Sequence, residues 1–196
     1  MALEESKTDK QDYSQARSWY RSAIAYLPEE NYYRGYIYAC ALDRDLENAQ
    51  LALEEAQSVF PASDFESSAL LIQAELCYYS GDYAGAVENY RKVLTVENSE
   101  SVLRNTFLTV NKVCVDGGDA LAAVRVELLE EACDRLPSSW FLFKPLLANA
   151  YHKQAELHPE ERELWLQKTL DAYVSSFSQS GKSLYSIQVP SPPLQG

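Results

Sequence analysis

The sequence predicts an all-α protein built from helical hairpins that stack side by side as a solenoid. Apolar residues recur every three to four positions in successive segments, as they do along one face of a helix. Short turns rich in Gly, Asp and Pro separate these segments. Three of the four cysteines, Cys40, Cys77 and Cys114, are spaced by 37 residues. A constant spacing of this length is typical of repeat proteins, in which one structural position recurs in each repeat.

The helical pattern divides into one single helix followed by four helix–turn–helix hairpins. Pro28, Pro61 and Pro137 each stop a helix, because proline cannot continue the hydrogen-bonded backbone. Gly81 supplies the left-handed residue that a helix end prefers. Pro159 is expected in the first turn of the last helix. The segments expected to be helical are 12–27, 31–42, 46–59, 64–79, 83–96, 99–115, 120–136, 140–157 and 159–177.

Short polar side chains at the starts of these segments are expected to act as N-caps, because their oxygen atoms can accept hydrogen bonds from free backbone N–H groups. The candidates are Asn31, Ser63 or Asp64, Asn98 or Ser99, and Ser138 or Ser139. The turns within hairpins are short, as antiparallel neighbouring helices require.

The expected domain organisation is a polar N-terminal tail at 1–11, a helical repeat domain at 12–178 and an extended, proline-containing C-terminal tail at 179–196. The segment Leu184–Leu194 (LYSIQVPSPPL) ends in a run that cannot be helical. Two interpretations of this tail stay open: it lacks structure of its own, or it docks in a groove of its own or of a neighbouring copy.

One hairpin resembles a tetratricopeptide repeat (TPR). The matching residues are Gly81, Asp82, Tyr83, Ala86, Tyr90 and Val93. Ala16, Ala49 and Ala86 are 33 and 37 residues apart, close to the 34-residue period of the family. The resemblance covers about residues 12–178, although the first helices lack the Trp and Leu-Gly signature of the family. It implies a right-handed superhelix of about nine helices, whose first helices line a concave face that binds polypeptides.

The side chains of this pattern are expected to pack the hairpins together. Small residues let neighbouring helix axes approach closely, and larger ones fill the space between hairpins. The small set is Ala49, Ala74 and Ala86, and the large set is Tyr20, Leu53, Tyr90 and Leu129. For Tyr13, Tyr20, Tyr83 and Tyr90 we expect core packing rather than ligand binding.

Ten residues on the first helices are the candidates for a peptide-binding groove. Arg34, Arg104 and Lys144 occupy similar places on three of these helices, in a chain with 17 basic and 29 acidic residues. Basic side chains can hold carboxylates, Asn can bond to a peptide backbone and Tyr offers flat contact area. The alternative is that the basic residues are solvated and tied to nearby acids. The ten candidates are Asn31, Arg34, Tyr38, Glu75, Tyr78, Arg104, Leu108, Asn111, Lys144 and His152.

The chaperone-binding members of the family clamp a terminal carboxylate with basic and Asn residues. Here the second hairpin offers Leu71 and Glu75 instead, so the full clamp is not expected.

No pattern in the sequence indicates an enzyme, a cofactor or a metal site: phosphate loops, nucleophile elbows and zinc-ligand spacings are absent. A net charge of −12 disfavours nucleic acid and direct membrane binding. The expected partner is therefore a protein or peptide, in the cytoplasm, since the chain carries no recognisable signal or membrane-spanning stretch. The alternative function is a structural, regulatory or dimerising segment of a larger protein, with an exposed patch around Tyr13, Trp19 and Tyr20 and a possible homodimer.

Overall fold

The computed structural model describes residues 13–178, and this part of the chain is all-α. It contains nine α-helices, three short 3₁₀ helices and no strand. The chain divides into two compact units, residues 1–98 and 99–196. The predicted tails, 1–11 and 179–196, lie outside the described residues.

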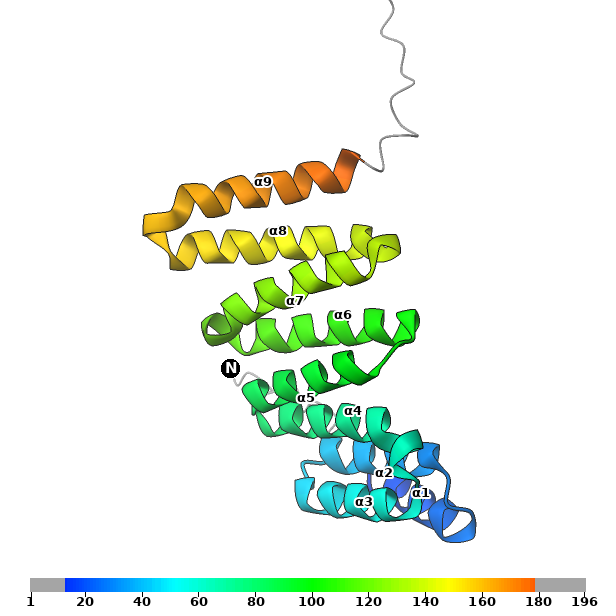
Figure 1. Ribbon diagram of the computed structural model, residues 1–196. Coiled ribbons are helices and arrows are strands. Elements are labelled where there is room, and N and C mark those ends of the chain that lie inside the picture. The colour runs from blue at the N-terminus through cyan, green and yellow to red at the C-terminus, as the bar shows by residue number, and fades with distance from the viewer. Residues whose placement is uncertain (1–12, 179–196) are drawn as a thin grey trace, which may run out of the picture. The chain divides into compact units, whose positions relative to one another are not determined.

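Unit 1 consists of a single helix and two hairpins. The hairpins are α2–α3 and α4–α5, and their first helices, α2 and α4, also contact each other. The single helix α1 packs on α2, and α3 packs on α4 (Figure 1). The predicted helices of this half of the chain are confirmed to within about three residues. Their bounds are α1 Ser14–Tyr26, α2 Glu30–Leu42, α3 Leu46–Val59, α4 Ala62–Ser80 and α5 Tyr83–Val96.

Unit 2 contains four helices, each of which packs on the next in chain order (Figure 1). A 3₁₀ turn leads into each of the last three helices. These turns are Gly118–Leu121, Pro137–Ser139 and Pro159–Glu161. The prediction that the seventh helix begins at residue 120 is therefore wrong by two residues, because the 3₁₀ turn comes first, and Pro159 lies in a 3₁₀ turn rather than in the last α-helix. The α-helices are α6 Glu100–Asp116, α7 Ala122–Arg135, α8 Trp140–Leu157 and α9 Arg162–Ser178.

Small residues lie at the tightest helix contacts, as the sequence predicts. Ala49, Ala74 and Ala86 have no exposed surface, so the backbones of their helices approach closely at these points. The larger side chains of Leu53, Tyr90 and Leu129 are buried, while Tyr20 packs at the edge of the unit 1 core. Burying a side chain of this size stabilises a fold by about 1.5–3 kcal/mol.

The turns after α2, α4 and α6 share a local conformation that recurs every 37 residues. Arg44, Gly81 and Gly118 have φ values of 63°, 85° and 70° and so adopt the left-handed conformation. Cys40, Cys77 and Cys114 each precede this residue by four positions, and an aspartate follows it directly. The cysteines are free thiols, and Cys40 and Cys114 are buried. The spacing seen in the sequence thus corresponds to a recurring turn.

The aspartate of this turn caps the next helix in unit 1. The Asp45 carboxylate accepts a hydrogen bond from the Asn48 backbone N–H at 3.3 Å, and that of Asp82 accepts one from the Gly85 N–H at 2.9 Å. At the equivalent place in unit 2, Asp119 instead forms an ion pair with Lys153 at 3.0 Å. The third turn therefore resembles the others in its backbone but not in its capping.

The N-caps predicted from short polar residues are largely wrong. Helix α2 begins at Glu30 after an extended Glu29, so Asn31 lies inside the helix. Helix α4 begins directly after Pro61, which places Ser63 and Asp64 within it. Asn98 lies before the cap position, and Ser138 lies inside the 3₁₀ turn. Ser99 and Ser139 occupy cap positions without a capping hydrogen bond.

Helix α1 is fastened to the first hairpin by two arginines one turn apart. Arg21 forms an ion pair with Glu55 of α3 at 2.6 Å, and its guanidinium lies 4.6 Å from the centre of the Tyr36 ring of α2. Glu55 also accepts a hydrogen bond from the buried Tyr33 hydroxyl at 3.0 Å. One carboxylate therefore connects three helices. The hydrogen bond from Arg21 is the main reason that the pKa of Glu55 lies below its ordinary value.

The second arginine, Arg17, binds the α2–α3 turn. It forms ion pairs with Asp43 at 3.0 Å and with Asp45. The hydrogen bond from the Asn48 side chain is the largest cause that lowers the pKa of Asp45, and Arg17 lowers it further. The residue that caps α3 thus also holds α1.

We expect these contacts to make unit 1 sensitive to acid. Because the folded pKa values lie below the ordinary 3.8 of Asp45 and 4.5 of Glu55, their stabilisation is fully present above about pH 5 and is lost as the pH falls through the folded pKa values. The substitution Glu55→Gln should lower the free energy of unfolding by about 1 kcal/mol at pH 7 and by much less at pH 3. Urea unfolding at both pH values measures this.

The matched control is Glu88→Gln, which removes an exposed carboxylate that pairs with Lys92 one turn away. Its effect should be small at both pH values. An effect of Glu55→Gln that is the same at pH 7 and pH 3 would contradict the assigned role of this carboxylate.

Candidate peptide-binding site

An open pocket of about 470 Å³ lies in unit 1 where α2 faces α1 and α4. Four of the ten predicted groove residues line it: Asn31, Arg34, Tyr38 and Glu75. Ala16 and Tyr20 of α1 and Tyr13 just before it also line the pocket. The sequence predicts core packing for Tyr13 and Tyr20. We call this the unit 1 pocket. It is large enough to take one or two side chains of a bound segment.

Gly35 determines how closely α1 approaches the wall of the unit 1 pocket. A Cβ atom at this position would lie 2.4 Å from two ring carbons of Tyr20. The Tyr20 ring therefore rests directly against the backbone of α2, a contact that only glycine permits. This contact fixes the Tyr20 ring as one side of the pocket.

Arg34 and Glu75 bring opposite charges to the unit 1 pocket without forming an ion pair. The Arg34 side chain is exposed and makes no hydrogen bond or ion pair with the described residues. Burial raises the pKa of Glu75, and the nearby charge of Arg34 partly offsets this effect. Arg34 therefore acts on Glu75 through its charge and not through an ion pair. Both groups retain free hydrogen-bonding capacity.

A row of tyrosines continues from the unit 1 pocket along α4 to α5. The Tyr79 hydroxyl donates a hydrogen bond of 2.8 Å to the Tyr38 hydroxyl, and the centres of the two rings lie 5.7 Å apart. The Tyr78 ring contacts the rings of Tyr79 and Tyr83 with centre separations of 5.5 and 5.8 Å. All these contacts have the edge-on geometry that aromatic pairs favour. We call Tyr38, Tyr79, Tyr78 and Tyr83 the tyrosine row.

Burial keeps the hydroxyl groups of Tyr79 and the nearby Tyr90 protonated over the whole physiological pH range. Burial is the main cause that raises the pKa of Tyr79, and the hydrogen bond with Tyr38 adds to it. The pKa of the buried Tyr90 beneath the row is raised by burial and by the charge of Glu75. The Tyr79 hydroxyl therefore acts as a neutral donor and acceptor, suited to contacts with a peptide backbone.

The other five predicted residues lie in unit 2 and do not gather in one pocket. Arg104 and Leu108 are half-buried on α6. Lys144 lines a hollow of about 310 Å³ where α8 faces α9. Asn111 accepts a hydrogen bond of 2.8 Å from the Arg125 Nε–H. His152 is exposed and lies 3.7 Å from Glu156.

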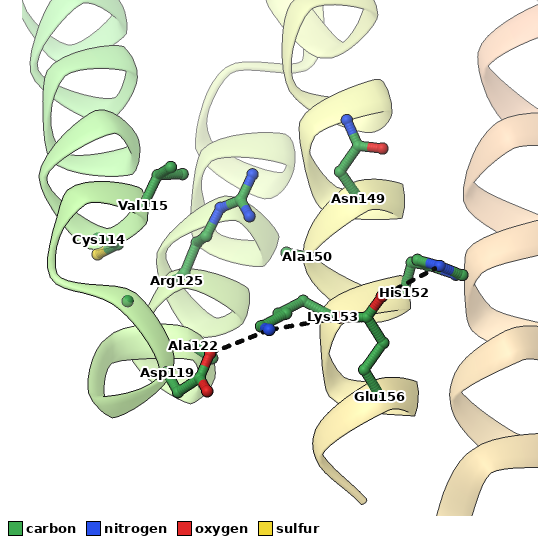
Figure 2. Close-up of a pocket in the computed structure, with 11 residues that line it drawn as sticks. Cys114, Val115, Asp119, Ala122, Arg125, Asn149, Ala150, His152, Lys153 and Glu156 are labelled. Atoms are coloured by element: carbon green, nitrogen blue, oxygen red, sulfur yellow. Dashed lines mark hydrogen bonds and ion pairs between the residues drawn. The ribbon is translucent and has the colours of Figure 1, made fainter.

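His152 belongs to the edge of a second pocket, of about 390 Å³, which we call the unit 2 pocket (Figure 2). The α6–α7 turn forms one side of it and α8 the other. The Lys153 side chain lies at the pocket edge and forms ion pairs with Asp119 at 3.0 Å and Glu156 at 3.3 Å. Arg125 points into the space between Val115 of α6 and Asn149 of α8 (Figure 2).

Sequence reasoning missed Arg125 and the part that α1 plays in the unit 1 pocket. Arg125 lies on a second helix, whereas only first helices were considered as sources of binding residues. Its position within the apolar run Ala122–Val126 (AAVRV) could have indicated a buried charge, because charged residues are seldom found among buried apolar ones unless they have a partner.

Comparisons with known proteins add no family to this picture, since no family model matches the chain and no curated protein matches it. Within residues 13–178, no group of three or more His, Cys, Asp or Glu side chains could hold a metal ion. No helix in this part of the chain is long and apolar enough to cross a membrane.

We expect the half-buried Glu75 carboxylate in the unit 1 pocket to lower the stability of the fold at neutral pH. A carboxyl group whose pKa is raised in the fold destabilises the protein as the pH rises above its ordinary value of 4.5. The substitution Glu75→Gln should therefore raise Tm at pH 7 by about 2–4 °C and have little effect at pH 3. Thermal unfolding followed by circular dichroism measures this.

Glu66→Gln, an exposed residue on the same helix, is the control and should leave Tm nearly unchanged at both pH values. A fall in Tm for Glu75→Gln at pH 7 would show that this carboxylate instead stabilises the fold.

Proposed function

We propose that this chain is a non-enzymatic protein-binding module, in which unit 1 holds an extended segment of a partner polypeptide. In this proposal the helical hairpins stack as a tetratricopeptide-like right-handed solenoid, and the unit 1 pocket lies on its concave face. The recurring left-handed turn at Arg44, Gly81 and Gly118 supports the repeat architecture. The contact between the first helices α2 and α4 supports a shared first-helix surface in unit 1.

The observation that carries the proposal is the free charge of Arg34 beside the tyrosine row. Arg34 is exposed, lines a pocket and forms no ion pair with the described residues. Its five N–H donors remain available to carbonyl or carboxylate groups of a ligand.

The surroundings of Arg34 suit an extended peptide better than a small metabolite. The tyrosine row extends the contact surface across α2, α4 and α5, and tyrosine is enriched at protein interfaces. Glu75 offers an acceptor for a backbone N–H, while Arg34 and Asn31 offer donors. Donors and acceptors along an aromatic strip match the alternating groups of a peptide backbone.

The test is a peptide selection followed by affinity measurements. Peptides selected from a displayed random library on the wild-type protein would be counter-selected on the Arg34→Ala variant. Fluorescence polarisation would then give the Kd of each peptide. We expect Arg34→Ala to weaken binding by about 1–3 kcal/mol, or roughly 5- to 150-fold, with Tm nearly unchanged because the side chain is exposed.

The matched control is Arg44→Gly, which removes the same charge from unit 1 at a turn where Gly81 and Gly118 occupy the equivalent position. This variant should bind the selected peptides as tightly as the wild type does. Equal affinity of Arg34→Ala and wild type for every selected peptide would rule out the unit 1 pocket as the binding surface.

A second candidate function, self-association, is favoured by the outer face of α9. Leu166, Leu170 and Val174 recur at helical spacing and are 37%, 56% and 56% exposed, which is unusual for apolar side chains on one stripe. The exposed patch expected on α1 is smaller: Trp19 is 67% exposed, whereas Tyr13 and Tyr20 are half-buried.

If α9 mediates self-association, Leu170→Glu should shift the protein from dimer to monomer in sedimentation equilibrium. The control Glu163→Gln on the same helix should leave the mass unchanged. A wild-type protein that is monomeric at all concentrations would exclude this second function and leave the peptide-binding proposal untouched.

A further inference from the structure

Arg125 in unit 2 is a half-buried cation that has no acidic partner among residues 13–178. Its Nε–H donates to the Asn111 Oδ1 at 2.8 Å, which fixes the plane of the guanidinium group. Its other two nitrogen atoms make no hydrogen bond or ion pair with the described residues. Neither nitrogen is one of the fully buried atoms that lack a hydrogen bond in this part of the chain. Both therefore remain accessible from the unit 2 pocket.

Partial burial of the Arg125 charge lowers the stability of the fold unless a ligand binds to the guanidinium group. Burial is the main cause that lowers the pKa of Arg125, and no carboxylate offsets it. Two arginines at helix contacts in unit 1 are paired instead: Arg17 with Asp43 and Asp45, and Arg21 with Glu55. Removing a charge from water without a partner is unfavourable. Arg125 therefore needs a reason other than stability.

The acids nearest to the unit 2 pocket are already engaged. Lys153 forms ion pairs with both Asp119 and Glu156. The net charge of these two acids together with Lys153 and Arg125 is zero. His152 lies near Glu156 at the outer edge. Because these four charges balance, an anion beside Arg125 meets no net repulsion from the pocket, and a monoanion is repelled less than a dianion by the two acids at the edge.

A second donor faces the same space from α8. The Asn149 Oδ1 accepts a hydrogen bond of 2.6 Å from the Tyr173 hydroxyl of α9, which leaves the Asn149 amide N–H groups to donate. In Figure 2 this side chain lies across the pocket from the guanidinium of Arg125. A planar anion between them would receive hydrogen bonds from both sides.

We propose that the unit 2 pocket binds the side-chain carboxylate of an Asp or Glu residue from a partner polypeptide, with the two free nitrogen atoms of Arg125 as a bidentate donor and Asn149 as the second donor. The flat fork of Arg matches a carboxylate in geometry and charge. Asn111 positions the guanidinium but does not itself touch the ligand. The site uses no residue of the unit 1 pocket, so it stands or falls independently of the peptide-binding function proposed there.

The binding test uses nuclear magnetic resonance on the full chain, with N-acetyl-glutamic acid amide as the probe. The Arg125 Nε–H and Asn149 side-chain amide resonances should shift in a saturable way. N-acetyl-glutamine amide, which has the same shape without the charge, should cause no such shift. With Arg125→Met the response at Asn149 should weaken at least tenfold, whereas Arg162→Met, an exposed arginine outside the pocket, should behave as wild type.

Three outcomes of this titration would overturn the proposal: no saturable shift, an equal response to the glutamine analogue, or an unchanged response in Arg125→Met. Tighter binding of inorganic phosphate than of the glutamate probe would replace the acidic side chain with a phosphate group as the ligand.

The thermal stability of Arg125→Met separates a binding role from a structural one. Met keeps most of the apolar volume and removes the unpaired charge, so its Tm should equal or exceed that of the wild type. A loss of several degrees would mean that Arg125 holds unit 2 together, and would overturn the proposal.

Discussion

The close approach of helices at alanine is the contact on which the rest of unit 1 depends. Ala49, Ala52 and Ala56 follow one face of α3 and are fully buried. Ala74 and Ala86 hold the same kind of position on α4 and α5. Because these side chains are small, neighbouring backbones pack closely, and larger side chains such as Tyr33 and Leu53 fill what remains. The α2 and α4 surfaces that carry Arg34 and Glu75 are brought together by this packing.

Four arginines show two situations with different consequences. Arg17 and Arg21 form ion pairs and connect α1 to the first hairpin. Arg34 and Arg125 form no ion pair with the described residues, and each lines a pocket. Arg44, Arg104 and Arg162 also lack an ion pair among these residues, so the missing partner alone does not locate a site. At Arg34 and Arg125 it coincides with neighbouring groups that can bind a ligand: the tyrosine row beside Arg34 and the Asn149 amide across from Arg125.

The sequence was sufficient to predict the helices, because periodicity and proline positions are local signals. Segments 46–59 and 83–96 begin and end where predicted. The N-caps were less predictable. Asp45 and Asp82 cap their helices because the left-handed turn before each of them directs the carboxylate back toward the helix, whereas Asn31 has a suitable side chain but lies inside α2.

The candidate site was predicted only in part. Arg34, Tyr38 and Glu75 meet because α2 packs on α4, but Arg125 faces a pocket formed by three segments, which no single-helix pattern reveals.

The recurring cysteine has a consequence for how the two units can be studied. Cys40 lies in unit 1 and Cys114 in unit 2, and both are almost completely shielded from solvent. Burial also raises the pKa of the Cys40 thiol, so little reactive thiolate forms at neutral pH. A thiol reagent can modify either residue only after the surrounding helices separate. Beside the half-buried Cys77 and Cys133, the native chain thus contains one fully buried thiol in each half. The labelling rates of Cys40 and Cys114 reveal whether the two halves open together or one at a time.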